Sequence, residues 1–243
     1  MDWRFLYRGL KARYVDQRPE LAALVGALHP GDVAVDVGAN KGSYLLSLSR
    51  ATPKGAVVAF EPQPVLAAYL RQACAASGLG NVVVEAAGVS SAAGVLTLAI
   101  PGDGASSPGA SFEASVAASE TCRQIDVPTV TLDGYFAADS RRIGAIKVDV
   151  EGHEQSVLAG AVGLIDRHRP TIVIECEQRH LTGMTVADVV GFVTARDYSG
   201  WFVQRGRRVP IDRFDVAAHQ RQQGERFWDG PDYCNNFIFE PRR

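Results

Sequence analysis

The sequence lacks a strong net charge of either sign. Its 243 residues include 25 lysines and arginines against 27 aspartates and glutamates, so the formal net charge is −2. A protein that holds a polyanion needs a basic field over its binding surface, and this composition supplies none. Nucleic-acid binding is therefore not expected as the main function.

Cysteine is scarce, and its spacing forms no motif. The four cysteines are Cys74, Cys122, Cys176 and Cys234, and no two of them form a CxxC pair. This pattern argues against a zinc knuckle, and a disulfide framework is not expected in a chain of this length. We expect reduced thiols in a cytoplasm.

Long apolar runs are also missing. No stretch approaches the roughly 20 apolar residues that a helix needs to span a bilayer. The N-terminus, MDWRFLYRGLKARYV, is basic, but it has neither the apolar run nor the cleavage site of a signal peptide. We therefore expect a cytoplasmic protein without stable insertion into a membrane.

The N-terminal segment, residues 1–30, is predicted to be helical and to precede the main domain. Trp3, Leu6, Leu10 and Tyr14 recur at helical spacing, with basic residues between them. One interpretation is a helix that docks on a membrane surface or on a partner. We favour the other, in which the helix lies across the domain with its basic face in water.

Residues 31–243 are expected to form a single α/β domain, because 47% of the chain is hydrophobic and can fill one large core. Helical patterns alternate with five β-branched apolar runs that are typical of parallel strands buried on both faces: 32–37, 55–61, 81–87, 145–150 and 171–177. Extended segments at 198–210 and 234–241 predict an antiparallel finish. The predicted fold is a doubly wound, mostly parallel, seven-stranded sheet of Rossmann-like type with an antiparallel C-terminal strand.

A block from Pro101 to Ser119 interrupts the alternation. Its sequence, PGDGASSPGASFEASVAAS, is small, polar and rich in turn formers. A loop of this length inside a compact domain is either disordered or a lid over a site. Both interpretations stay open at this point.

The turn after the first strand suits the close approach of a ligand to the backbone. Its two glycines are spaced as Gly38-Ala39-Asn40-Lys41-Gly42, and glycine lets the main chain approach a ligand without a Cβ clash. The amides at the start of the next helix then face an anion. The dinucleotide fingerprint G-x-G-x-x-G would need a glycine where Asn40 stands, and the P-loop pattern is also missing.

An acidic residue, Glu61, ends the second strand. It lies roughly 20 residues past the glycine turn, where a carboxylate accepts hydrogen bonds from both ribose hydroxyls of a nucleotide. Alternatively, Glu61 caps the helix that begins at Pro62. A ligand with an adenosine but no pyrophosphate fits this turn, and S-adenosylmethionine is such a ligand. Its adenine would meet the loop after the third strand, from Ala87 to Val89.

Five motifs in this order, DVGANKG, AFEPQP, VTLDGYF, IKVDVEGHE and RPTIVIE, resemble the FkbM family of S-adenosylmethionine-dependent methyltransferases. The resemblance covers residues 32–177 and the terminal NNFIF. It implies a class I methyltransferase fold and, usually, O-methylation of a sugar or natural-product hydroxyl. Carried over by position, the resemblance implies that Asp36, Gly38, Asn40 and Glu61 line the cofactor. The predicted cofactor site further includes Ala39, Gly42, Pro62 and Ala87.

The fourth strand ends in KVDVEGHE, which gathers acidic groups at the predicted crevice. A sugar or aliphatic hydroxyl is a poor nucleophile, so a positioned base should take its proton. Asp149, Glu151 and His153 are the candidate catalytic residues, since clustered carboxylates raise one another's pKa toward neutrality. The sequence does not choose among them. For Glu154 we expect only a cap on the next helix.

The fifth strand ends in IECEQRH, which brings Glu175, Glu177 and His180 to the same edge. Asp149 and Glu175 could hold Mg²⁺, which prefers oxygen ligands. We favour the alternative, a second wall of the substrate site without a metal.

These observations together predict an S-adenosylmethionine-dependent O-methyltransferase that acts on a hydroxyl of a sugar, glycolipid or secondary metabolite. Its expected partner is a small-molecule or glycan acceptor, and a homo-oligomer is also considered. Two alternatives stay open, an NAD-type oxidoreductase on a similar sheet and a non-catalytic module that binds S-adenosylmethionine.

Overall fold

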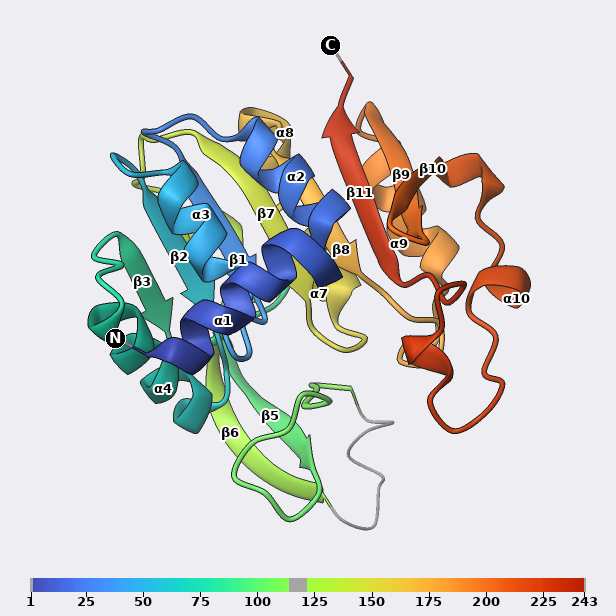
Figure 1. Ribbon diagram of the computed structural model, residues 1–243, viewed down its shortest axis with the longest axis horizontal. Coiled ribbons are helices and arrows are strands. Elements are labelled where there is room, and N and C mark those ends of the chain that lie inside the picture. Colours follow the sequence, from blue (N-terminus) through green and yellow to red (C-terminus); the bar gives the residue numbers. More distant parts are fainter. Residues whose placement is uncertain (1, 114–121, 243) are drawn as a thin grey trace.

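An eight-stranded mixed sheet forms the centre of the protein (Figure 1). The computed structural model describes residues 2–113 and 122–242. Strands β3, β2, β1, β7 and β8 lie side by side and parallel, and β11, β9 and β10 follow, each antiparallel to its neighbour. The strands are β1 (Val33–Val37), β2 (Ala56–Phe60), β3 (Val82–Glu85), β7 (Ile143–Asp149), β8 (Thr171–Glu175), β9 (Tyr198–Gln204), β10 (Arg207–Pro210) and β11 (Asn236–Pro241).

The predicted α/β class, with a mostly parallel core and an antiparallel C-terminal finish, is confirmed. The predicted count of seven strands is wrong by one, because segment 198–210 folds into the hairpin β9–β10. At its turn Arg205 and Gly206 have φ angles of 49° and 70°. Two consecutive residues with positive φ suit a two-residue hairpin connection, so the segment supplies two strands instead of one.

A second, three-stranded sheet projects beyond the carboxyl ends of the central strands (Figure 1). It contains β4 (Gly88–Val89), β6 (Cys122–Val130) and β5 (Gly94–Pro101) in that order. The predicted insert, residues 101–119, lies between β5 and β6. Its residues 101–113 are described, whereas 114–119 lie outside the described residues.

Helices cover both faces of the central sheet, and alternate residues of β1 enter the two cores. Val35 and Val37 pack with the side of α6, α7, α8 and α9, whereas Ala34 packs with the side of α1, α2, α3 and α4. The helices are α1 (Trp3–Lys11), η1 (Ala12–Asp16), α2 (Arg18–Ala27), α3 (Leu45–Ala51), α4 (Pro64–Ala76), α6 (Leu132–Tyr135), α7 (Glu154–Ala159), α8 (Val162–His168), α9 (Val186–Thr194), η2 (Ile211–Arg213), α10 (Val216–His219) and η3 (Phe227–Asp229).

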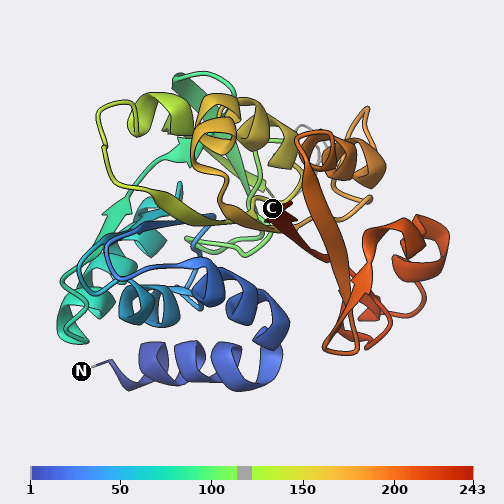
Figure 2. The ribbon, with the colours of Figure 1, turned by 90° about the horizontal axis from the view of Figure 1, so that it is seen from above.

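Helix α1 lies across the outside of the α2 and α3 layer, as favoured from the sequence (Figure 2). Its predicted inward stripe is wrong, however. Phe5, Gly9 and Ala12 are buried, whereas Trp3 and Tyr14 are 74% and 68% exposed. The reason is close packing: a Cβ on Gly9 would lie 2.9 Å from the Leu46 Cβ, so this small-residue face lets α1 approach α3. Among the described residues, every helix is too short or too polar to span a bilayer.

Candidate active site

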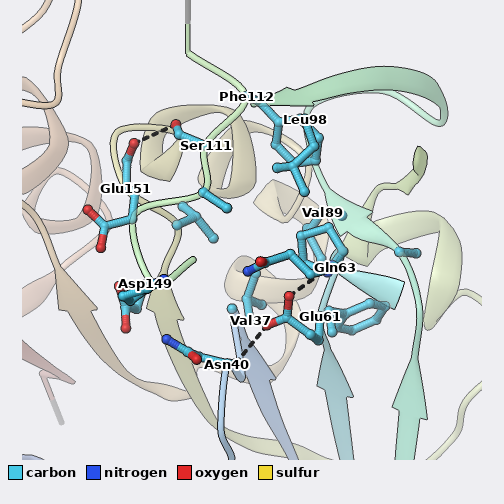
Figure 3. A pocket seen from close by; sticks show the side chains of 18 of the residues that line it. Val37, Asn40, Glu61, Gln63, Val89, Leu98, Ser111, Phe112, Asp149 and Glu151 are labelled. Carbon is cyan, nitrogen blue, oxygen red and sulfur yellow. Dashed lines mark hydrogen bonds between the residues drawn. The ribbon is translucent and has the colours of Figure 1, made fainter. Parts of the chain in front are cut away.

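A cavity of about 240 Å³ opens at the carboxyl ends of the central parallel strands (Figure 3). This is the edge where the sequence predicted a crevice. The predicted site residues that line it are Gly38, Asn40, Glu61, Pro62, Ala87, Asp149, Glu151 and Glu175. The structure therefore brings most of the predicted cofactor residues and two of the three predicted catalytic residues to one place.

The two glycines of the turn do different work. Gly38 has a φ of 77°, and a Cβ there would lie 1.8 Å from the Asp149 carbonyl oxygen. Glycine at this position thus lets the turn approach the end of β7. Gly42 lies away from the cavity lining, and a Cβ there would meet the rings and methyls of Phe5 and Leu70 at 2.7 and 2.8 Å. Gly42 therefore accommodates close packing, and its predicted contact with a ligand stays a prediction.

Glu61 connects the glycine turn to the start of α4. One carboxylate oxygen accepts a hydrogen bond from the backbone amide of Asn40 at 2.7 Å, and the other accepts one from the backbone amide of Gln63 at 2.9 Å (Figure 3). The N-cap of α4 is Gln63, not Glu61. Burial raises the pKa of Glu61 to about 6. Each carboxylate oxygen keeps a further lone pair, so Glu61 can still accept hydrogen bonds from a ligand in the cavity.

A buried lysine organises the acidic residues behind the turn. The Lys147 ammonium donates to the Gly38 carbonyl at 2.9 Å and to Asp149 at 3.1 Å, and lies 3.6 Å from Asp36. Burial lowers the pKa of Lys147, but the charges of Asp149 and Asp36 outweigh burial and raise it overall. Asp36 is 1% exposed and its oxygens accept no hydrogen bond within the described chain.

Glu175 is a further carboxyl group that lines the cavity at this edge. It receives a hydrogen bond from the Asn235 side-chain amide at 2.8 Å. Burial, followed by the charge of Asp149, raises the pKa of Glu175 well above its usual range. Glu177 lies outside the cavity lining, bonded to Arg179 and to the Tyr233 hydroxyl.

A second hollow of about 230 Å³ adjoins the cavity and shares Gly38, Asn40 and Asp149 with it. Ala39 lines this hollow, together with two residues of the N-terminal segment, Arg8 and Gln17. The Gln17 Oε1 and Asn40 Oδ1 atoms are buried without a hydrogen-bond partner in the described residues. Sequence reasoning missed Arg8 and Gln17, since neither belongs to a motif.

The described part of the insert closes one wall of the cavity. Gln63 and Ser107 exchange two hydrogen bonds, of 3.0 and 2.8 Å, and the Ser111 hydroxyl donates to the Glu151 carbonyl at 2.6 Å. Ser111 and Phe112 line the cavity (Figure 3). For residues 101–113, the arrangement matches the lid interpretation of the sequence.

His153 holds this wall in place from outside the cavity lining. Its Nε2 lies 2.9 Å from the Ser90 hydroxyl and its Nδ1 lies 2.9 Å from a Glu113 carboxylate oxygen. The ring also packs on Phe112 at a centroid distance of 5.1 Å. Because both ring nitrogens already have partners in the protein, the geometry indicates that His153 positions this wall and does not contact a ligand.

The remaining polar groups flank Asp149. Glu151, in a left-handed conformation with φ of 52°, pairs with His180 at 2.8 Å. Burial lowers the pKa of His180, but the hydrogen bond to Glu151 and the negative charge of Glu151 together raise it overall. Glu154 is the first residue of α7, not its N-cap as expected, and accepts from the Gly152 amide at 2.9 Å.

The described residues contain no group of three or more histidine, cysteine, aspartate or glutamate side chains arranged to hold a metal ion. Asp149 and Glu175 both line the cavity, as the magnesium alternative requires. The cation beside Asp149 is the Lys147 ammonium.

Comparisons with known proteins agree with this architecture. A family model described as the methyltransferase FkbM domain matches residues 36–199. The methyltransferase sdnD of Sordaria araneosa is 34% identical over 122 residues, and the 31-O-demethyl-FK506 methyltransferase FkbM of Streptomyces tacrolimicus is 32% identical over 160. These matches cover 48% and 55% of this chain, but 43% and 60% of the relatives. The chain thus spans about half the length of the curated relatives it matches.

A crystal structure of methyltransferase FkbM from Methylobacillus flagellatus KT shares the fold. It superposes with a TM-score of 0.55 at 16% identity, covering 99% of this chain and 55% of that chain. At this identity the likeness concerns the fold, which is that of the class I methyltransferases.

Proposed function

This chain belongs to the methyltransferase FkbM domain family, and we propose that it is an S-adenosylmethionine-dependent O-methyltransferase. Its acceptor is a hydroxyl of a sugar, glycolipid or secondary metabolite. The observation that carries the proposal is Glu61, a buried carboxylate bonded to the glycine turn that still offers free lone pairs to the cavity. The relative named as a 31-O-demethyl-FK506 methyltransferase supports transfer to oxygen on a natural product.

The two adjoining spaces fit the two ends of S-adenosylmethionine. In the larger cavity, Glu61 would accept hydrogen bonds from the ribose hydroxyls, and Val89, Leu98 and Phe112 offer an apolar wall to the adenine. In the second hollow, the Arg8 guanidinium suits the carboxylate of the amino-acid end. The buried oxygens of Gln17 and Asn40, which lack donors, suit its ammonium group.

Asp149 lines both spaces, so it lies where the adenosine part and the amino-acid part of the ligand would join. S-adenosylmethionine, when bound, supplies an electrophilic methyl group on a sulfonium. In the proposed reaction Asp149 would take the proton of the acceptor hydroxyl. The cofactor would supply the methyl group, whose bond to sulfur breaks with its electron pair left on the sulfur of S-adenosylhomocysteine. Glu151, held by His180, lines the acceptor side of the cavity, and His153 positions the wall that carries Phe112.

We propose that no metal takes part in this reaction. The Lys147 ammonium already lies between Asp36 and Asp149, where a divalent ion would have to compete with it. Burial, which raises the pKa of Glu175, in addition disfavours the charged carboxylate form that Mg²⁺ prefers as a ligand. We further propose that residues 1–30 act with the domain 31–243, since Arg8 and Gln17 complete the second hollow.

The test begins with calorimetry of the purified protein. We expect S-adenosylhomocysteine to bind and NADH not to bind, after which an acceptor screen with methyl-labelled S-adenosylmethionine should reveal label on an acceptor oxygen. Binding of NADH in place of S-adenosylhomocysteine would establish the oxidoreductase alternative. Binding of S-adenosylhomocysteine without transfer to any hydroxyl compound would favour the non-catalytic module.

A further inference from the structure

The outward face of α1 and η1 carries an unbroken apolar stripe. Trp3, Tyr7, Leu10 and Tyr14 are 74%, 67%, 42% and 68% exposed. Their spacing of four, three and four residues places them on one side of a helix. Single exposed apolar side chains are ordinary on soluble proteins, but four in line on one helix form a contiguous patch that marks an interaction surface.

This stripe lies opposite the buried face of the helix. The 100° turn per residue puts Phe5, Gly9 and Ala12 about half a turn away from Trp3, Tyr7, Leu10 and Tyr14. The inward face makes the close contact with α3, where Gly9 meets Leu46, and the aromatic side chains stay mostly exposed. An apolar stripe that the fold leaves outside needs another partner.

Cationic side chains accompany the stripe. Arg4 and Lys11 are exposed on α1, with Lys11 paired to Asp16 at 2.8 Å. Next to the stripe lies a groove of about 210 Å³, lined by Leu10, Tyr14, Val25 and Leu46 together with Arg13 and Arg50. An apolar floor between arginines suits a molecule with an apolar body and an anionic head.

We propose that α1 and η1 bind the surface of an anionic lipid bilayer. Tryptophan and tyrosine combine an apolar ring with a polar edge and favour the boundary between headgroups and acyl chains. Arg4 and Lys11 would face lipid phosphates, and the adjacent groove would receive apolar chain segments. A helix that lies in the interface in this way needs no membrane-spanning length. This inference stands independently of the proposed methyl transfer.

The position of α1 gives such binding a consequence for the site. Arg8, on the same helix, lines the hollow beside the glycine turn and donates a hydrogen bond to the Lys41 carbonyl at 3.0 Å. A bilayer that holds α1 therefore lies near the edge of the sheet where the cavity opens. This last consequence, unlike membrane binding itself, rests on the proposed function: the arrangement favours an acceptor drawn from the membrane, such as a glycolipid.

Co-sedimentation with vesicles tests the inference. The full chain is mixed with vesicles of phosphatidylcholine alone, or with about one third phosphatidylglycerol. We expect at least about tenfold stronger partition onto the anionic vesicles, and weakening as salt screens the surface charge. Binding should shift tryptophan fluorescence to the blue, since Trp3 moves out of water.

Three variants make the test specific. Trp3→Ser/Tyr7→Ser/Tyr14→Ser should lose at least about tenfold in partition at a nearly unchanged melting temperature, because these side chains are 67–74% exposed. Arg4→Gln/Lys11→Gln should lose the preference for phosphatidylglycerol. The matched control Val95→Ser, a 66% exposed apolar residue on β5, should bind as wild type.

Three results would overturn the inference. The first is wild-type protein that stays in the supernatant with anionic vesicles, and the second is a triple variant that partitions as the wild type does. The third is a dimer in sedimentation equilibrium that the triple variant abolishes, without vesicle binding, which would assign the stripe to a second copy of the chain.

Discussion

Replacing Glu61 by Gln tests the proposed ribose contact directly. Glu61 accepts hydrogen bonds from the backbone amides of Asn40 and Gln63. In the variant a side-chain NH₂ group replaces one acceptor oxygen, so one of these donors loses its partner. This loss lowers folding stability by about 1–3 kcal/mol. The same change removes a buried carboxylate with a pKa of about 6, instead of the usual 4.5. That shift corresponds to about 2 kcal/mol of destabilisation near neutral pH. The two effects offset, so the variant should stay folded.

The effect on ligand binding should be larger. Glutamine keeps one acceptor oxygen and loses one charge-assisted hydrogen bond, which contributes about 1.5–3 kcal/mol. The Kd for S-adenosylhomocysteine should therefore rise by about 10- to 150-fold. Calorimetry near neutral pH measures this rise, with a thermal melt to confirm folding. Glu240→Gln, a carboxylate change on β11 outside the cavity lining, serves as the matched control and should bind as wild type.

The same contact predicts a pH dependence. Below its pKa of about 6, Glu61 of the wild type is protonated and loses its charge. The wild-type affinity should therefore fall as pH is lowered through about 6, and the gap between the wild type and the Gln variant should narrow. An unchanged Kd in the variant, or a gap that stays constant with pH, would refute the ribose contact.

Other predictions address the remaining parts of the site. Asp149→Asn should lower turnover by at least about 100-fold with S-adenosylhomocysteine affinity within about threefold, and unaltered turnover would reject Asp149 as the base. Arg8→Ala should weaken the binding of S-adenosylhomocysteine by about tenfold. It should leave the binding of methylthioadenosine, which lacks the amino-acid end, unchanged. Equal losses of affinity for both ligands would contradict the assignment of the second hollow. Burial raises the pKa of Glu154 to about 7, so the free energy of unfolding should fall as pH rises from about 4.5 to 7. In urea unfolding, Glu154→Gln should remove about 3 kcal/mol of that fall. Parallel curves of unfolding free energy against pH for the wild type and the variant would contradict this prediction. Turnover should survive EDTA, and its loss with recovery on Mg²⁺ would restore the metal alternative.

Much of the fold could be predicted from local patterns. The five β-branched apolar runs correspond to the parallel strands β1, β2, β3, β7 and β8. Parallel strands place their carboxyl ends at one edge, so the sequence alone predicted that Gly38, Glu61 and Asp149 would meet there. Cavity lining by all three agrees with that reasoning.

The places of other residues depend on partners far along the chain. His153 is bonded to Ser90 and to Glu113, residues 63 and 40 positions away, and no local pattern predicts either contact. Gly42 resembles a ligand-binding glycine, but Phe5 and Leu70 occupy the space above it. In both cases tertiary packing decides whether a polar or flexible residue faces a ligand or the core.

The element types and the edge that holds the site could be predicted from the sequence, because hydrophobic periodicity and strand direction are properties of the local chain. The buried side of α1, in contrast, depends on the packing of the folded chain. Trp3 and Tyr14 carry large rings, unlike Gly9 and Ala12, but stay exposed, because α1 and α3 approach closely where the side chains are small. The place of Arg8 and Gln17 beside the glycine turn follows from the same packing of the N-terminal segment, which no local pattern predicts.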